Sequence, residues 1–510
     1  MRLKQVAFIM AIALLVAGCN GHAVLVERKA GEVGAGGVAP GTLDEAGGGG
    51  NALSEGGSGS VDLGDQAAGG SGGASGVPGT KDAGEANCAT NSNPEQGFTD
   101  KTLKLGTIVP VSGALRPLGE QTARVMKVSV EATMNRQQFI PGPYSNLNWG
   151  CPTRPGIFGR KVSLKIFSLQ ANTPEEALAG MRRLIDVENI FLVRDCYLQT
   201  SLMGPATQYQ GSKGVPGIWC HFSEMPYPEL APWNFAPGAD PQVLSALHTG
   251  LLVKQFDKER LAILADPTAK STTVRAALAT AKYLKHPIPS DCVVYKRAQE
   301  APNGMRSEIA ALRTCYGGQA PDAVIALDAL NGVFGALEAK QQGWRPADSG
   351  VKWSCTGTSC WITSLAELCA NACEGMLTDC ATLPCVPFAS PKKYPAVEAL
   401  ERTRTQNFPQ EPQDILTYAP AAITGGIALW LTMTGPDLSR EKFRETMEND
   451  LKNWSAGIGP VINITPDDHF GAAAGWIIEF TGRSSWFKDQ SGGFLTLDDV
   501  GVPYSIAVGN

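Results

Sequence analysis

Small polar residues recur in short segments that directly follow apolar, strand-like runs of the chain. These segments are residues 112–119, 197–201, 221–223, 266–272 and, more weakly, 328–331. Hydroxyl groups, backbone N–H groups at helix starts and one or two aromatic rings can hold a small polar ligand and exclude water. We therefore expect a ligand-binding site in these segments. The alternative for each polar group is a local cap or turn hydrogen bond.

Signatures of common enzymes are absent from the sequence. It contains no G-x-x-x-x-G-K-[ST] phosphate loop, and neither G-x-G-x-x-G nor G-x-S-x-G follows a strand-like run. The triplet Asp467-Asp468-His469 is the most enzyme-like, but Pro466 favours a turn between two C-terminal strands there. The five His lack the spacing of metal ligands. We therefore expect no catalytic residue, no cofactor and no metal. A secreted enzyme is kept as an alternative function.

Length and charge narrow the class of protein. The chain has 510 residues, enough for two or three domains, and a formal net charge of −6. Its 43 basic and 49 acidic residues are scattered, so no basic block predicts nucleic-acid binding. Residues 419–431 form the most membrane-like internal run, but Pro420, Gly425 and Gly426 interrupt it and favour a buried helix.

Residues 1–19 have the pattern of a lipoprotein signal peptide. Arg2 and Lys4 form a charged start, and residues 6–16 are an unbroken apolar run that is too short to span a bilayer. The sequence VAGC then resembles a lipobox, in which the Cys19 thiol is acylated. We expect an extracytoplasmic protein that is lipid-anchored to the cell membrane, in the periplasm or on the outer face of the envelope. An ordinary signal peptide that happens to end in cysteine is the alternative.

Residues 20–98 are predicted to be a disordered, glycine-rich linker. Residues 21–80 alone contain twenty glycines and few large apolar side chains. Such a composition cannot bury enough surface to offset the entropy that ordering costs. The folded domain is therefore expected to span residues 99–510.

Cysteine usage indicates an oxidising compartment. Thirteen cysteines leave an even twelve once Cys19 is set aside, which favours disulfides in an exported chain. Two pairs each bracket a predicted loop–helix–strand unit, Cys196 with Cys220 and Cys292 with Cys315. Cys88 and Cys151 are then left to pair. The last six allow fifteen pairings: Cys355, Cys360, Cys369, Cys373, Cys380 and Cys385. A zinc cluster is the alternative, but no C-x-x-C motif supports it.

Strand-like and helix-like segments alternate from residue 103 onward. The predicted strands are residues 103–109, 162–167, 190–193, 217–219, 261–264, 292–294, 323–327 and 476–480. Helices are expected to begin at Gly119, at the capping box of residues 173–176, at Asp240-Pro241 and at Asn331-Gly332. Such alternation predicts parallel sheets with helices on both faces, and roughly 400 residues suit two lobes.

Three motifs occur in a recognisable order. Residues 110–113 read PVSG, residues 156–164 read GIFGRKVSL, and residues 459–470 read GPVINITPDDHF. Together, over roughly residues 103–480, they resemble the ABC-transporter solute-binding lipoproteins of the leucine/isoleucine/valine type. The resemblance implies a type I periplasmic-binding fold, in which two Rossmann-like α/β lobes with parallel sheets are joined by a three-crossing hinge.

The resemblance also implies how the lobes divide. Lobe 1 would hold about residues 103–237 and 376–454, and lobe 2 about 238–375 and 455–510. The ligand would lie in the cleft that the hinge closes. A monomer with a small-molecule ligand and an ABC permease as its membrane partner is the expected assembly.

The candidate ligand-binding residues come from the polar segments, and they include Leu118 because the resembling family often has an aromatic residue at this position. They are Ser112, Leu118, Tyr197, Gln199, Thr200, Ser201, His221, Phe222, Asp266, Lys270, Ser271 and Asp328. Amino-acid receptors of the family usually carry a Ser- and Ala-rich second loop, a small residue followed by Ser or Thr in the third, and an aromatic residue near Leu118. This chain has YLQTS at 197–201 and His221-Phe222 instead. A larger or less charged solute is therefore as good an expectation as an α-amino acid.

The expected function is that of an extracytoplasmic receptor that delivers a small polar solute to an ABC importer. The solute would be amino acid-like or another small organic molecule. A sensory ligand-binding protein on the same fold, which signals to a membrane partner, is the alternative.

Overall fold

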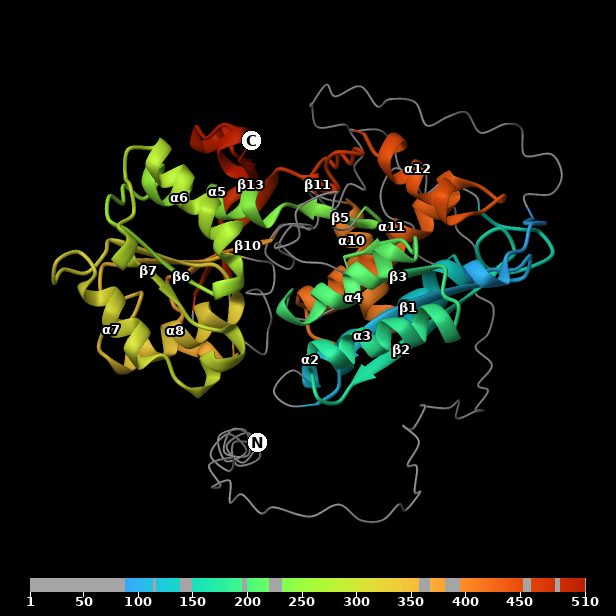
Figure 1. The fold of residues 1–510 in the computed structure, drawn as a ribbon, viewed down its shortest axis with the longest axis horizontal. Helices are drawn as coiled ribbons and strands as arrows, with labels where there is room; N and C mark the ends of the chain where they lie inside the picture. The colour runs from blue at the N-terminus through green and yellow to red at the C-terminus, as the bar shows by residue number, and fades with distance from the viewer. Residues whose placement is uncertain are drawn as a thin grey trace, which may run out of the picture. The chain divides into compact units, whose positions relative to one another are not determined.

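The computed structural model describes residues 88–112, 116–137, 149–194, 200–219, 232–356, 367–380, 395–452, 460–481 and 487–509. These residues form two sheets, each flanked by helices (Figure 1). The expected signal peptide, the anchor cysteine Cys19 and most of the expected linker lie outside the described residues.

The first sheet holds six strands in the order β11–β5–β4–β3–β1–β2, and every pair in it is parallel. The strands are β1 (Thr102–Pro110), β2 (Lys161–Leu169), β3 (Leu192–Arg194), β4 (Gly217–Ile218), β5 (Asn234–Ala239) and β11 (Phe470–Ala472). Strand β1 is buried on both faces: Leu103 and Leu105 join one core cluster, and Ile108 joins another. Such two-sided burial explains why β1 is largely apolar after Lys104.

Helices cover both faces of this first sheet. They are α2 (Arg116–Ser129), α3 (Pro174–Arg182), α4 (Thr200–Ser212), α10 (Pro395–Asn407), α11 (Ile415–Thr434) and α12 (Arg440–Asp450). Helix α2 packs against α11, and α3 packs against α4. Two π-helical segments, Val130–Asn135 and Arg183–Val187, extend α2 and α3. Among the described helices, α11 is apolar and long enough to cross a membrane, but 83% of its apolar window is buried, as expected for a core helix.

The second sheet holds seven strands in the order β13–β12–β10–β9–β8–β6–β7. The strands are β6 (Leu261–Ala265), β7 (Val293–Tyr295), β8 (Ala323–Ala326), β9 (Lys352–Cys355), β10 (Leu377–Cys380), β12 (Ala474–Phe480) and β13 (Phe487–Thr496). Pairing is parallel from β7 to β10, whereas β10–β12 and β12–β13 are antiparallel. The fold is therefore α/β with parallel-dominated sheets, and β12 is an expected strand whose direction breaks the parallel pattern.

Helices on the two sides of the second sheet enclose separate cores. They are α5 (Pro241–Lys254), α6 (Thr273–Tyr283), α7 (Arg306–Thr314), α8 (Ala329–Gln341) and α13 (Tyr504–Val508). Figure 1 shows α5 and α6 on one side of β6 and β7, with α7 and α8 on the other. Alternate residues of β6 follow this division, because Leu261 and Ile263 belong to one cluster while Ala262 and Leu264 belong to the other.

The expected helix starts are confirmed in part. Asp240 caps α5 by accepting from the N–H of Gln242 at 2.7 Å, with Pro241 at the first helical position. Helix α8, by contrast, begins at Ala329 with Asp328 as its cap, so the expected start at Asn331 is too late. Helix α2 is already formed at Arg116, so Gly119 does not open it.

Gly119 is needed for another reason, since a Cβ there would lie 1.8 Å from the carbonyl oxygen of Pro110. The capping box is also half right. Thr173 accepts from the N–H of Glu176 at 3.2 Å, but the Glu176 carboxylate turns to the backbone N–H groups of residues 170–172.

The last part of the expected linker belongs to the fold. Ala89 and Phe98 are almost fully buried, and Cys88 forms a disulfide with Cys151. The Arg160 guanidinium lies over the Phe98 ring and donates to the carbonyl of Thr99 at 2.8 Å. The predicted linker is too long because it was assigned from glycine content, which does not reveal that a few side chains at its end are buried.

Disulfides are present as expected from the cysteine count. Besides Cys88–Cys151, the structure contains Cys292–Cys315 and, within the late cluster, Cys369–Cys373. Cys355 is also disulfide-bonded. The expected pair Cys196–Cys220 lies outside the described residues, as do Cys360 and Cys385.

Three passages of the chain join the two sheets. The first runs from β5 through Asp240 into α5. The second comes after Cys380, because β10 still belongs to the second sheet, rather than near residue 376. The third lies between Ala472 of β11 and Ala474 of β12, rather than near residue 454. Both expected boundaries are too early because neither β10 nor β11 was predicted as a strand.

Candidate ligand-binding site

Ser112 lies at the carboxyl end of β1, where ligands bind in open α/β sheets. Its hydroxyl donates to the carbonyl of Gln170, and the side-chain amide of Asn172 donates to the Ser112 hydroxyl at 3.1 Å. Asn172 adopts a left-handed conformation with φ 52°, which asparagine tolerates better than most residues. Ser112 therefore joins the loops after β1 and β2, and it presents a hydroxyl that is already engaged locally.

Leu118 is a partly buried residue of α2 that packs against the main core cluster. On the same helix, the exposed Arg116 and the half-buried Glu120 form an ion pair at 2.7 Å. The family position at Leu118 is thus filled by a side chain that contributes mainly to packing.

The second and third candidate loops start side by side. Strands β3 and β4 are parallel neighbours, with Arg194 in register with Ile218 at their carboxyl ends. Thr200 and Ser201 form the first turn of α4. Tyr197, Gln199, His221 and Phe222 lie outside the described residues. The sheet therefore brings the starts of these two loops together, as a shared site requires.

Asp266 directly follows β6 in the second lobe and caps the short helix that comes next. Its carboxylate accepts from the N–H of Thr268 at 3.0 Å and from the N–H of Ala298 at 2.7 Å. Lys270 and Ser271 follow on the short 3-10 helix Pro267–Ser271 and are both exposed. Lys270 and Ser271 are therefore accessible to a ligand from solvent, whereas the hydrogen bonds of the Asp266 carboxylate hold the loop in place.

Asp328 lies two residues beyond β8, the neighbour of β6, and caps α8. Its carboxylate accepts from the backbone N–H of Asn331 at 2.8 Å and from the Asn331 side-chain amide at 2.7 Å. Burial raises the pKa of Asp328 to about 6, and the charge of Asp266 adds to the effect. The structure therefore brings two of the predicted residues together, as an acidic pair at the carboxyl edge of the second sheet.

Sequence reasoning missed a Ser–His–Asp network in the second lobe. The Nε2 atom of His248 lies 3.1 Å from Oδ1 of Asp379, and its Nδ1 atom is hydrogen-bonded to the Ser354 hydroxyl. All three residues are 0% exposed, so no substrate can reach the hydroxyl. They come from α5, β9 and β10, and no local signal in the sequence links them. The network connects α5 to the sheet from within.

The triplet at residues 467–469 lies in a turn, as expected. Pro466 and Asp467 form the turn itself, and Thr465 pairs with Asp468 across it. His469 is buried, is hydrogen-bonded to the carbonyl of Asn234 at 2.8 Å, and stacks on Phe235. Burial lowers the pKa of His469, so the imidazole is neutral near pH 7.

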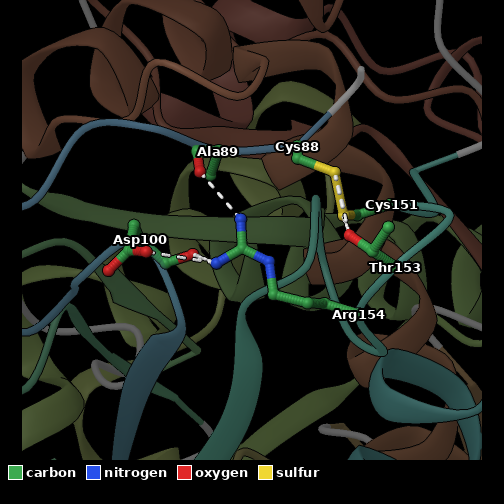
Figure 2. Close-up of a disulfide and its surroundings, with 6 residues drawn as sticks. All are labelled: Cys88, Ala89, Asp100, Cys151, Thr153 and Arg154. Atoms are coloured by element: carbon green, nitrogen blue, oxygen red, sulfur yellow. Dashed lines mark hydrogen bonds and ion pairs between the residues drawn. A yellow bond between two sulfur atoms is a disulfide. The ribbon is translucent and has the colours of Figure 1, made fainter. Parts of the chain in front are cut away.

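A shallow cavity of about 510 Å³ lies elsewhere on the first lobe. It is bordered by the end of the π-helical segment Val130–Asn135 and by residues 150–155. Cys151, one of the lining residues, belongs to the disulfide drawn in Figure 2. Residues 150–155 precede β2, so this cavity lies at the opposite edge of the sheet from the strand-end loops. Among the described residues, no group of three or more His, Cys, Asp or Glu could hold a metal ion.

Comparison with known proteins agrees with this architecture. The sequence profile of the periplasmic binding protein family matches residues 102–484. A search of curated proteins finds no match.

Among solved structures, the fold is similar to a possible leucine/isoleucine/valine-binding protein from Rhodopirellula baltica, with a TM-score of 0.60 and 14% identity over 81% of this chain and 99% of that one. A fatty acid ABC transporter substrate-binding protein from Thermomonospora curvata gives a TM-score of 0.58 and 16% identity over 81% of this chain and 97% of that one. A solute-binding protein from Rhodopseudomonas palustris, solved with 3,4-dihydroxybenzoic acid, gives 0.57 and 16% over 78% of this chain and 98% of that one.

The profile match covers most of the chain, and the two parallel-dominated sheets joined by three passages reproduce the type I architecture. The chain belongs to the periplasmic binding protein family, as a member with the type I fold of the leucine/isoleucine/valine-binding type.

Proposed function

We propose that this protein is an extracytoplasmic solute receptor that delivers a small organic molecule to an ABC importer. The observation that carries the proposal is the family match over residues 102–484, on a fold with two lobes and three passages between them. The bound solute would lie between the lobes, where the carboxyl ends of strands from both sheets supply the polar segments. Closure of the lobes would follow because some ligand contacts exist only when both lobes are engaged.

The solute class stays broader than an α-amino acid. Structures on the same fold come from proteins described for branched-chain amino acids, for a fatty acid and for a dihydroxybenzoic acid. In this chain Tyr197, His221 and Phe222 replace the small residues that amino-acid receptors carry in their second and third loops. Aromatic and imidazole groups suit a solute with an unsaturated or apolar body and a polar end.

Identification of the ligand is the first experiment. Native mass spectrometry of the purified full-length chain should detect a retained small molecule. Thermal-shift screening with amino acids, fatty acids and hydroxybenzoates should raise the melting temperature for one of these classes, because a ligand that binds only the folded state stabilises it. A chain that retains no molecule and responds to none of these classes would contradict the proposal. Loss of uptake of the identified solute on deletion of the protein would separate an importer receptor from a sensor.

Replacing Tyr197 or His221 by alanine is expected to weaken binding of the identified solute by about 1–3 kcal/mol, the usual cost of leaving a polar partner unpaired. Isothermal titration calorimetry measures the loss. Tyr283→Ala and His286→Ala are the matched controls, because these residues lie at the end of α6 and beyond it, away from the strand-end loops. If the Tyr197 and His221 variants bind the solute as tightly as the unsubstituted protein does, the binding site must lie in other loops.

We further propose that Cys19 carries the lipid that anchors the receptor. The lipobox-like VAGC sequence supports this assignment. Cys19→Ala is expected to move the protein from the membrane fraction to the soluble extracytoplasmic fraction, since acyl chains would provide its attachment to the membrane. Fractionation with immunoblotting measures the shift, and mass spectrometry of the N-terminal peptide tests for the acyl groups. A variant that stays with the membrane would show a different anchor.

A further inference from the structure

A backbone hydrogen bond joins two of the passages between the lobes at Asp240, a residue whose carboxyl group is buried. Asp240 occupies the first passage, between β5 and α5, and is only 4% exposed. Its backbone N–H donates to the carbonyl of Ala472, which lies at the start of the third passage, at 3.2 Å. Any rotation of one lobe against the other must change the backbone near these residues, because the passages are the covalent connections between the lobes.

A second carboxylate, that of Asp468, acts on Asp240 through its charge and accepts hydrogen bonds from both lobes, from the N–H of Phe470 at 2.9 Å and from Tyr504. Asp468 comes just before β11 of the first sheet, and its carboxylate accepts from the Tyr504 hydroxyl at 2.8 Å. Tyr504 belongs to α13, which packs on α5 and α6 of the second lobe. Arg275 of α6 fixes that helix by donating to the carbonyls of Ala507 and Val508 at 3.1 and 2.7 Å. The Tyr504–Asp468 hydrogen bond therefore connects the two lobes beside the hinge.

The groups that face Asp240 come from each neighbouring element. Gln242 of α5 donates to its carboxylate, Asp468 approaches from the β11 side, Arg275 from α6 and Tyr504 from α13. Burial raises the pKa of Asp240 to about 7, with a further increase from the negative charge of Asp468. Burial and the neighbouring carboxylates also raise the pKa of Tyr504, so its hydroxyl keeps the proton that it donates.

We propose that Asp240, Asp468 and Tyr504 form a proton-dependent latch at the hinge. When Asp240 is protonated, Asp468 is the one negative charge of the pair, and the Tyr504 bond holds the arrangement of lobes described here. When Asp240 releases its proton to water, two carboxylates repel each other within a partly buried site. Movement of Asp468 away from Tyr504 relieves the repulsion, so the lobes rotate more freely at higher pH.

Single-molecule Förster resonance energy transfer between dyes on the two lobes tests the latch in the absence of any ligand. Azidophenylalanine replaces Val187 of the first lobe and Tyr283 of the second, which are 69% and 44% exposed, so dyes can be attached without touching the cysteines. In the full-length chain, the distance distribution is expected to shift between pH 5.5 and 8.5 with a midpoint near 7, the pKa of Asp240. Asp240→Asn should keep the low-pH distribution throughout, since an amide still caps α5 but cannot ionise.

Tyr504→Phe should show the high-pH distribution at every pH, because it removes the hydroxyl and leaves the ring of a partly exposed residue in place. This variant keeps the test decisive even if Asp240→Asn does not fold. A dye pair on Val187 and the exposed Lys127, both in the first lobe, should not respond to pH. The latch would be overturned if the distance distribution of the wild-type protein did not change with pH, or if the Asp240→Asn variant kept the same midpoint. It would also be overturned if the dye pair within the first lobe shifted as much as the pair between the lobes.

Discussion

Replacing His248 by alanine is expected to lower the free energy of unfolding by about 3–5 kcal/mol. The imidazole lies in the core of the second lobe between Ser354 and Asp379, and all three side chains are fully buried. Its removal takes the hydrogen-bonded ring away from a buried carboxyl group and leaves a cavity. Both changes destabilise, because a buried carboxyl group that loses a hydrogen bond is less well compensated for its desolvation, and a cavity removes packing contacts.

Urea denaturation followed by circular dichroism measures this loss. Thr249→Val is the matched control, since Thr249 is the next residue of α5, is equally buried, and donates only to the carbonyl of Ser245 at 2.8 Å within its own helix. That change should cost no more than about 1 kcal/mol. A His248 variant as stable as the control would mean that the network contributes little to the fold.

Removing the Cys88–Cys151 disulfide by a double alanine substitution is expected to cost about 4 kcal/mol of stability. The bond joins residues 63 apart, and the entropy that a crosslink removes from the unfolded chain grows with the loop it closes. It also fastens residues 88–99 to the first lobe. Figure 2 shows Arg154 beside the bond, donating to the carbonyls of Ala89 and Asp100 at 3.1 and 2.8 Å.

The Cys369–Cys373 disulfide is the internal comparison for this prediction. It joins residues only 4 apart, so the same loop-closure relation predicts a loss of about 2 kcal/mol for its double alanine variant. Thermal unfolding of both variants under oxidising conditions gives the ranking. If the short loop costs as much as the long one, packing around the cysteines rather than loop closure sets the stability.

Elements whose side chains are buried on both faces could be read directly from the sequence. Strand β1 and strand β6 are short apolar runs because helices cover both sides of each sheet. Strand β5, with the sequence NFAPGA, and strand β13, which contains SGG, were not predicted. Their proline and glycine residues argue against a strand locally, and pairing with neighbours in the sheet provides the extended conformation instead.

The candidate site was predictable only as a set of positions. The sequence predicted that Asp266 and Asp328 each follow the carboxyl end of a strand, and the strand order adds that the two strands, β6 and β8, are neighbours. Their roles were not predictable, because whether a carboxylate caps a loop or faces a ligand depends on which backbone N–H groups lie near it. Here each accepts from the N–H groups of the loop or helix that follows its strand.

The sequence by itself determined what depends on neighbouring residues: the apolar runs that became strands, the Asp240-Pro241 helix start, and the cysteine count that indicated disulfides. Only the tertiary structure decided which distant residues meet. It placed His248 against Asp379, 131 residues away, and carried Tyr504 to Asp468 beside the hinge. The physical reason is that periodicity and capping act over one or two turns of chain, whereas contacts between distant residues form only when whole sheets and helices pack.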